Sequence, residues 1–203
     1  MASDDSRGEV VLVRHGETEW TLTGQHTGRT DIPLTERGRN EARLLAPLLS
    51  TADFALVLSS PLRRARETCE LAGLGSRMEI EPNLMEWNYG DYEGLTSKQI
   101  RATAPKWMVF TDGCPGGESP EQVGARADRV IDRIRQVSGR VALFAHGHLL
   151  RVLAARWIGL PPSAGQHFLL DTSTLGVLGY YQEVPAIKHW NAPVTAPNDT
   201  LGS

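Results

Sequence analysis

The chain has 203 residues, of which 40 % are hydrophobic and 22 % are charged, and its formal net charge is −3. This length suits one well-buried core, and the composition is too apolar for general disorder. So weak a net charge provides no positive field to draw nucleic acid or anionic lipid to the whole surface, and we expect neither nucleic acid nor a membrane as a partner.

Polar segments at both ends frame one predicted domain. Residues 1–8 are acidic and polar with no apolar run behind them, which predicts a flexible tail rather than a signal peptide or an anchor. Residues 191–203 are rich in proline and asparagine and predict a second tail. No linker, repeat or membrane-length apolar run divides residues 9–190. We therefore expect a single cytoplasmic domain with free thiols at Cys69 and Cys114.

The first half of this domain alternates apolar runs with helical patterns. The run at 9–14 (EVVLVR) predicts a buried strand. Thr35 predicts the start of a helix whose apolar face holds Ala42, Leu45, Leu48 and Leu49. A second buried strand is expected at 54–59 (FALVLS). A second helix is expected to begin at Pro61 and to end at Gly73.

The second half continues the alternation. Ser119 predicts the cap of a third helix, which Gly139 stops, and the run at 141–145 (VALFA) predicts a third buried strand. Two late strands are expected at 168–170 and 175–181. Strands that alternate with helices predict a three-layer α/β fold, in which a mainly parallel sheet has helices on both faces.

Residues that suit a phosphate group follow three of these strands. The first strand leads into residues 14–17 (RHGE), the second into 59–64 (SSPLRR), and the third into 146–148 (HGH). Ligands of such sheets bind outside the carboxyl ends of the strands, so these segments are expected to meet at one edge. A single histidine at such a place is more often structural, but three junctions together favour a site.

The residue types at this edge match phosphoryl transfer. Arg14 and Arg64 offer forked donors for phosphate oxygens, and His146 offers a charged donor when protonated. A neutral His15 has the lone pair that a nucleophile needs. Glu86 lies between apolar and aromatic neighbours, where burial would raise its pKa and let it act as a general acid. An exposed loop carboxylate is an equally good interpretation of Glu86.

Four segments in this order resemble the histidine phosphatase superfamily, also called phosphoglycerate-mutase-like. They are the two histidine segments at 14–17 and 146–148, the run at 62–68 (LRRARET) and the run at 86–94 (EWNYGDYEG). The resemblance covers nearly the whole domain. It is greatest to the sedoheptulose-bisphosphatase-like branch and the related bacterial acid phosphatases.

The resemblance implies a role for each matching residue. It makes His15 the phosphorylated nucleophile, Arg14 and Arg64 the phosphate clamps, His146 the second catalytic histidine and Glu86 the proton donor. Substrate contacts are expected from Thr27, Gly28, Tyr89, Gly147 and His148. One residue departs from the pattern, because Thr21 stands where asparagine is usual, which leaves that phosphate contact open.

The resemblance also implies a metal-independent phosphatase without a cofactor. Mutases carry extra basic residues after the proton donor to hold a second acid group. The interval 95–119 has only Lys98, Arg101 and Lys106 as cations, which favours hydrolysis over mutase transfer. We expect small phosphate esters as substrates, and family likeness alone favours sugar phosphates among them. A homodimer stays open.

Alternatives stay open both for the function and for single residues near the pocket. In a metal hydrolase, His146 and His148 would bind a metal with a carboxylate and His26, His167 or His189. In a phosphate-binding module the same scaffold would carry no catalysis. Near the pocket, Trp20, Trp87, Tyr89 and Tyr92 are either pocket walls or core residues, and Glu118 and Ser119 are either rim residues or a plain helix start.

Overall fold

The computed structural model describes residues 8–194, and one mixed sheet forms the centre of this part of the chain. Its strand order is β3-β2-β4-β1-β5-β6, with parallel pairing from β3 to β1 and antiparallel pairing of β5 and β6. The predicted mainly parallel sheet is therefore confirmed. The strands are β1 (Val10–Arg14), β2 (Phe54–Ser59), β3 (Met78–Ile80), β4 (Arg140–Ala145), β5 (Leu175–Tyr181) and β6 (Val184–Ala192).

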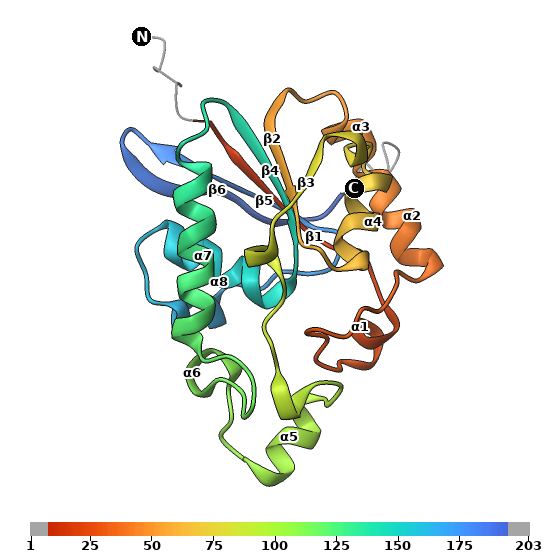
Figure 1. Ribbon diagram of the computed structural model, residues 1–203, viewed down its shortest axis with the longest axis vertical. Helices are drawn as coiled ribbons and strands as arrows, with labels where there is room; N and C mark the ends of the chain where they lie inside the picture. The colour runs from red at the N-terminus through yellow and green to blue at the C-terminus, as the bar shows by residue number, and fades with distance from the viewer. Residues whose placement is uncertain (1–7, 195–203) are drawn as a thin grey trace, which may run out of the picture.

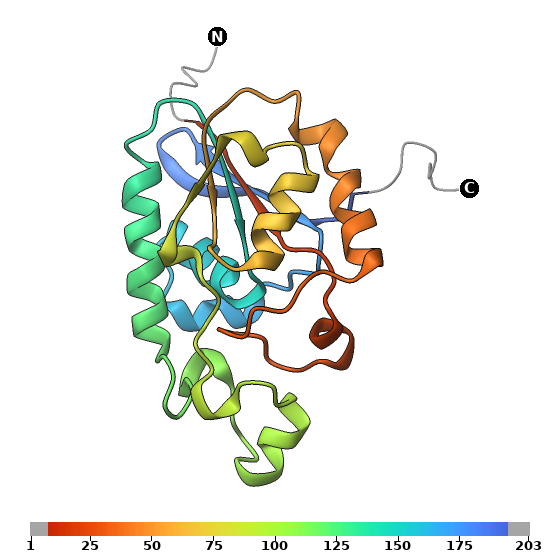
Figure 2. The ribbon, with the colours of Figure 1, turned by 45° about the vertical axis from the view of Figure 1, so that its right-hand side comes forward.

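Helices cover both faces of the sheet (Figure 1). Helices α7 and α8 lie on one side, and α2, α3 and α4 lie on the other. Helices α1, α5 and α6 lie beyond the carboxyl ends of the parallel strands, as the turned view also shows (Figure 2). Their bounds are α1 (Glu19–Thr23), α2 (Glu36–Leu44), α3 (Ala46–Leu49), α4 (Arg63–Leu71), α5 (Ser97–Thr103), α6 (Val109–Asp112), α7 (Pro120–Ile134) and α8 (Gly147–Trp157).

Alternating side chains of β1 explain the three layers. Val10 and Leu12 belong to the core shared with α7 and α8, whereas Val11 and Val13 belong to the core shared with α3 and α4. Strand β4 is buried from its second residue onward and divides its side chains in the same way. Because both faces of these strands are covered, their sequences are continuous apolar runs. The three-layer α/β prediction is confirmed.

Three helix predictions were wrong in detail. Helix α4 begins at Arg63 rather than at Pro61, because Leu62 still has extended backbone at the N-cap position. The expected face of the Thr35-capped helix fails at Leu48, whose side chain is 55 % exposed. The helix turns there, since α2 ends at Leu44 and α3 starts at Ala46. The third helix ends at Ile134, before the predicted Gly139.

The expected strand at 168–170 does not form. This segment is irregular and follows a 3-10 helix at Pro162–His167, with Leu169 pointing outward. Strands β3 and β6 were not predicted. Strand β6 continues to Ala192 and so crosses the boundary expected at residue 190. Residues 1–7 and 195–203 of the two predicted tails lie outside the described residues.

The two cysteines lie on opposite sides of the sheet. Cys69, on α4, is buried in one core, and Cys114, in the loop before α7, is buried in the other. Both are free thiols, as predicted. Burial raises the pKa of each thiol to about 12. Within residues 8–194, no helix combines the length and apolar character needed to cross a membrane.

Candidate active site

His15 lies at the carboxyl end of β1 and is held there by main-chain contacts. Its backbone N–H donates to the carbonyl of Ala145 on β4 (3.0 Å), and its ring Nδ1 lies 2.8 Å from the carbonyl oxygen of Gly16. A carbonyl only accepts, so Nδ1 carries the proton and Nε2 keeps its lone pair. Burial, with the charges of Arg64 and Arg14, holds the pKa of His15 well below 6.5. This geometry provides a neutral nitrogen nucleophile.

His146 lies next to His15 and is oriented by two side chains. The two ring centroids are 5.1 Å apart. Arg64 Nε donates to Nδ1 of His146 (3.2 Å), and Nε2 of His146 lies 2.8 Å from the hydroxyl of Ser60. An arginine N–H can only donate, so Nδ1 is the acceptor and Nε2 holds the proton. His146 is therefore neutral here, in contrast to the charged donor that we expected.

Burial and nearby positive charge explain this neutral state. Burial, together with Arg64, His15 and Arg14, holds the pKa of His146 well below 6.5. Ser60 follows β2 in the segment 59–64 that was expected at this edge, but it was not predicted as a site residue. Its backbone N–H donates to the carbonyl of Phe144 on β4 (2.9 Å), which fixes the hydroxyl opposite the histidine. The ring remains a neutral N–H donor.

Arg64 is fully buried, and most of its N–H groups donate to other groups of the protein. Besides His146, its guanidinium donates to the carbonyls of Thr27, Gly28 and Thr30, each at 3.0 Å. The same loop is held from its N–H side by the carboxylate of Glu93, which accepts from Gly28 and Thr30. Arg64 thus has one N–H left for a phosphate oxygen. The N–H of Gly28 already donates to Glu93, so it is not free to make the substrate contact expected of Gly28.

Arg14 lies over the amino end of α8. One of its terminal nitrogens donates to the carbonyl of Leu170, and its buried Nε has no partner. A Cβ at Gly147 would lie 3.2 Å from the guanidinium carbon, so only glycine leaves this contact unstrained. A buried donor without a partner is costly unless a ligand supplies an acceptor. Arg14 is therefore arranged to bind an anion.

The carboxylate of Glu86 is buried, so the exposed-loop interpretation was wrong. Oε1 accepts from the backbone N–H groups of Trp87 and Leu149, each at 2.9 Å. Oε2 accepts from the N–H of His148 at 3.0 Å. Two of these three donors belong to the first turn of α8. All of these contacts fix the position of the carboxyl group.

A cavity of about 200 Å³ opens where these segments meet. It is lined by six of the ten predicted site residues. These are Arg14, His15, Thr27, Tyr89, Gly147 and His148. The other four, Arg64, Glu86, Gly28 and His146, lie directly behind that wall through the hydrogen bonds described above. A larger hollow of about 340 Å³, near Ser138 and Gly139, lies at the opposite end of the strands and contains none of the ten.

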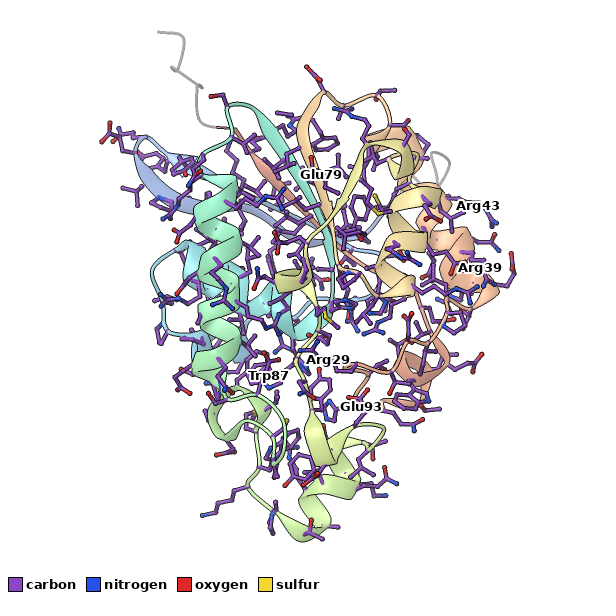
Figure 3. The ribbon with its side chains drawn as sticks, viewed as in Figure 1. Arg29, Arg39, Arg43, Glu79, Trp87 and Glu93 are labelled. Carbon is purple, nitrogen blue, oxygen red and sulfur yellow. The ribbon has the colours of Figure 1, made fainter. Side chains whose placement is uncertain are left out.

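Aromatic and polar side chains form the outer part of the cavity. Tyr89 Oη is hydrogen-bonded to Nδ1 of His148, and the ring of His26 lies 4.8 Å from that of Tyr89. Trp20 also lines the cavity, as expected for a pocket wall. Trp87 is fully buried and belongs to the core (Figure 3), and Tyr92 packs against Trp107. Trp87 and Tyr92 are thus packing residues.

Thr21 has a structural reason to replace the usual asparagine. Its hydroxyl donates to the carbonyl of Thr18 (2.7 Å) and accepts from the N–H of Thr18 (2.9 Å), which closes the capping box of α1. The side chain lines the cavity, but its hydroxyl is engaged by the protein. Arg151, on α8 one turn after Gly147, also lines the cavity and was not predicted. The sequence signal for Arg151 was its position four residues after Gly147, which places both residues on the same face of α8.

The remaining alternatives can be compared with the geometry. Glu118 is ion-paired with Arg126 and does not line the cavity, and Ser119 caps α7, so the plain helix start is the correct interpretation. Both ring nitrogens of His146 are engaged by Arg64 and Ser60. Across residues 8–194, no group of three or more histidine, cysteine, aspartate or glutamate side chains is arranged to hold a metal ion.

Two buried histidines, His15 and His146, and two half-buried ones, His26 and His148, predict a pH-dependent fold. Burial lowers the pKa of His26 to about 4 and those of His15, His146 and His148 well below 6.5. Below pH 6.5 the unfolded chain binds protons that the folded chain does not, so the free energy of unfolding must fall as pH falls. Each histidine contributes at most roughly 1.4 kcal/mol per pH unit. Urea midpoints at pH 7.0 and 5.5 measure this, and equal midpoints would contradict it.

Fold and site together are those of a phosphoryl-transfer enzyme, because a neutral histidine lies beside buried arginines at the carboxyl ends of parallel strands. The comparisons give the family. The model of the histidine phosphatase superfamily (branch 1) matches residues 10–193. The chain therefore belongs to the histidine phosphatase superfamily, and it is a phosphatase.

Individual relatives agree with this assignment. An acid phosphatase of Mycobacterium tuberculosis is 44 % identical over 175 residues, which cover 84 % of this chain and 86 % of the relative. Sedoheptulose 1,7-bisphosphatase of Saccharomyces cerevisiae is 35 % identical, with 74 % and 67 % covered. A solved structure of a Mycobacterium tuberculosis open reading frame product superposes with a TM-score of 0.87 at 38 % identity, with 93 % and 99 % covered.

Proposed function

We propose that this phosphatase hydrolyses small sugar phosphates through a phosphohistidine on His15. The observation that carries the proposal is the His15 ring itself. Its Nδ1–H bond to Gly16 leaves the Nε2 lone pair free, beside the unpartnered Nε of Arg14 in the cavity wall. A neutral nucleophile next to an unsatisfied cation is the arrangement that attack on a phosphate anion needs.

In the first step, Nε2 of His15 forms a bond to phosphorus while the ester P–O bond breaks. Glu86 gives its proton to the departing oxygen. The charge that develops on the other oxygens is met by Arg14 and by the remaining N–H of Arg64, while His146 stays bonded between Arg64 and Ser60. The positive phospho-imidazole is stabilised by the Nδ1–H bond to Gly16.

In the second step, water attacks the phosphohistidine. The Glu86 carboxylate takes a proton from the water, a new P–O bond forms, and the N–P bond returns its electron pair to Nε2. Inorganic phosphate leaves, and both residues regain their starting states. The main-chain donors on Glu86 hold its carboxylate in one place for both proton transfers.

The size and polarity of the cavity support sugar phosphates as the substrate class. A volume of about 200 Å³ suits a small metabolite. Gln25, His26, Tyr89 and His148 in its outer wall can hydrogen-bond hydroxyl groups. Named relatives include sedoheptulose 1,7-bisphosphatase and glucosyl-3-phosphoglycerate phosphatase, which fit this class. A panel of sugar phosphates, bisphosphates and phosphoglycerates, assayed for released phosphate, tests it.

Mutase-type transfer is the second candidate, because a probable phosphoglycerate mutase of Photorhabdus laumondii is 32 % identical. Lys98, Arg101 and Lys106 are exposed and do not line the cavity, which supports hydrolysis. The same panel, assayed for isomerised phosphoglycerate, separates the two. Isomer formation faster than phosphate release would overturn the hydrolase proposal.

The pH profile of kcat/KM is expected to be bell-shaped with its optimum below neutrality. The acid limb reports protonation of His15, whose pKa lies well below 6.5 because the ring is buried beside Arg64 and Arg14. Activity should therefore persist into acid. Phosphate monoesters gain a proton below about pH 6. The bound ester can then pass this proton to Glu86, which donates it to the leaving oxygen. Rates on a sugar phosphate from pH 4 to 9 test this, and an alkaline optimum would count against the assignment.

Replacing Glu86 with glutamine is expected to slow esters with poor leaving groups selectively. Glutamine fills the same space but has no proton to give, so hydrolysis of an alkyl phosphate should fall by about 10² to 10³ in kcat. An aryl phosphate, whose leaving group needs little protonation, should lose far less. Steady-state kinetics on glycerol phosphate and on an aryl phosphate measure the difference. Equal slowing of both would remove Glu86 from the acid role.

A further inference from the structure

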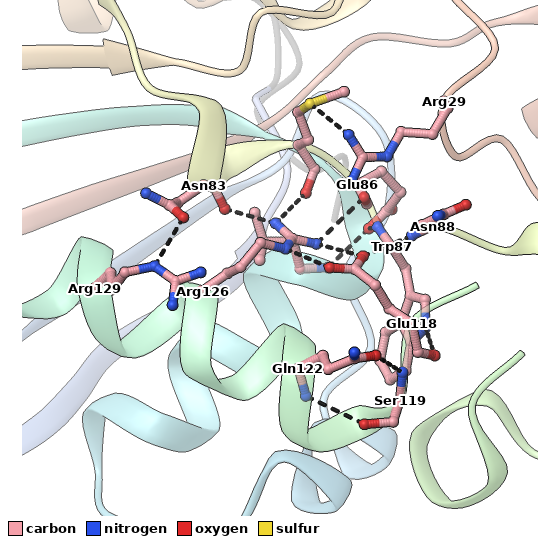
Figure 4. Close-up of polar contacts among 12 residues, drawn as sticks. Arg29, Asn83, Glu86, Trp87, Asn88, Glu118, Ser119, Gln122, Arg126 and Arg129 are labelled. Carbon is pink, nitrogen blue, oxygen red and sulfur yellow. Dashed lines mark hydrogen bonds and ion pairs between the residues drawn. The ribbon is translucent and has the colours of Figure 1, made fainter. Parts of the chain in front are cut away.

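Arg126 on α7 holds the main chain that carries Glu86 (Figure 4). Its Nη1 donates to the carbonyls of Asn83 (2.7 Å) and Met85 (2.8 Å), and its Nη2 donates to that of Glu86 (3.4 Å). The remaining two N–H groups donate to Glu118, from Nε at 2.7 Å and from Nη2 at 2.9 Å. All five guanidinium donors are thus used, and the side chain is nine-tenths buried.

The segment needs such a donor because its backbone belongs to no strand or α-helix. Residues 85–88 are irregular and follow a short 3-10 helix at Pro82–Leu84. Buried carbonyls outside regular structure must find donors elsewhere. A planar guanidinium can serve three carbonyls and a carboxylate at once, whereas a lysine ammonium is a point charge without this fork. The position therefore requires arginine.

Glu118 completes this clamp from the loop before α7. It neutralises the buried Arg126 and accepts from the N–H of Asn88 (2.8 Å), while its own N–H donates to the carbonyl of Asn88 (2.9 Å). Burial raises the pKa of Glu118, but the hydrogen bond and charge of Arg126 outweigh it and lower the pKa. A Cβ at Gly117 would lie 2.2 Å from the Asn88 carbonyl, so only glycine lets these loops meet.

Glu86 is thus fixed from two helices at once. The amino end of α8 binds its carboxylate through His148 and Leu149, and α7 binds its backbone through Arg126. The clamp has no hydrogen bond to His15 or Arg14, which are held by β4 and Leu170. Disturbing it should therefore displace the acid without displacing the nucleophile.

We propose that Arg126 and Glu118 are positioning residues for proton donation by Glu86. They set the distance between its carboxylate and the departing ester oxygen, and they do so through Glu86. The inference rests on the proposed role of Glu86 as the proton donor. Misplacement of a reacting group by about 1 Å can cost up to about 10² in rate, so a small shift of this loop is enough to be measured.

The test compares Arg126→Lys with a matched control, Arg129→Lys. Arg129 lies one turn further along α7 and donates only to the side chain of Asn83 (3.0 Å). For Arg126→Lys we expect kcat on glycerol phosphate to fall by about tenfold to a hundredfold, and kcat on an aryl phosphate by less than about threefold. Arg129→Lys should change neither rate. Glu86→Gln, measured beside them, gives the full effect of losing the acid.

The outcomes separate the inference from the proposed function. A selective loss in both Glu86→Gln and Arg126→Lys supports the clamp. If Glu86→Gln slows glycerol phosphate selectively but Arg126→Lys slows both esters equally, or slows neither, the clamp is overturned and Glu86 remains the acid. No selectivity in Glu86→Gln overturns both. If Arg126→Lys does not fold, Glu118→Gln replaces it, because it keeps an acceptor for Asn88 while removing the counter-charge, and the same criteria apply.

Discussion

Replacing His15 with alanine is expected to abolish turnover, with a loss of at least about 10⁴ in kcat. The variant lacks the Nε2 lone pair that forms the bond to phosphorus in the proposed mechanism, and water held in its place is a far weaker nucleophile. Covalent labelling should vanish at the same time. A radiolabelled ester mixed with the enzyme and quenched in denaturant measures both, because phosphohistidine survives alkali and is lost in acid.

A second histidine of the same cavity provides the control for this experiment. His148 lines the pocket and is hydrogen-bonded to Tyr89, but it lies in the first turn of α8 rather than after β1. A His148→Gln variant should still become labelled, even where its turnover on sugar phosphates is reduced. Labelled phosphate on the His15→Ala protein would mean that another residue is the nucleophile, and the mechanism above would have to be abandoned.

Replacing Arg64 with alanine is expected to damage both activity and stability. In the proposed mechanism the one remaining N–H binds the phosphate, and Nε orients His146, so kcat should fall by about 10² to 10³. The carbonyls of Thr27, Gly28 and Thr30 would also lose their donor. Gly28 is buried, and an unsatisfied buried group costs about 1 to 3 kcal/mol, so the free energy of unfolding should fall by at least about 1 kcal/mol.

Arg66, two residues along α4, is the matched control for this substitution. It is exposed on the same helix, so Arg66→Ala should leave both kcat and the urea midpoint nearly unchanged. Urea unfolding and steady-state kinetics on the same preparations test the pair. An Arg64→Ala protein with wild-type stability would show that the loop at 27–30 does not depend on this side chain.

The strands predicted most accurately were those buried on both faces. β1, β2 and β4 are continuous apolar runs that end abruptly in polar residues, so their positions could be read from the sequence. β6 escaped prediction because it is a half-exposed edge strand with Pro185 near its start and an irregular register to β5. β3 has three residues and presents no period.

The site was predictable where it depends on strand ends and unpredictable where it depends on partners far along the chain. His15 and His146 follow β1 and β4, so their convergence follows from parallel pairing. The neutral state of His146 depends on Arg64, 82 residues away. The clamp on Glu86 depends on Arg126, 40 residues away, and its sequence surroundings are those of an ordinary helix face.

The strand order also determines when the sheet can fold during translation. β4 lies between β1 and β2, so these two early strands share no ladder until residues 140–145 have emerged from the ribosome. Until then their apolar faces need shielding, and a nascent chain arrested before β4 should be digested readily by protease. Arrival of β4 joins the halves and delivers His146 in the same event. Catalytic competence and protease resistance should therefore appear together, late in translation.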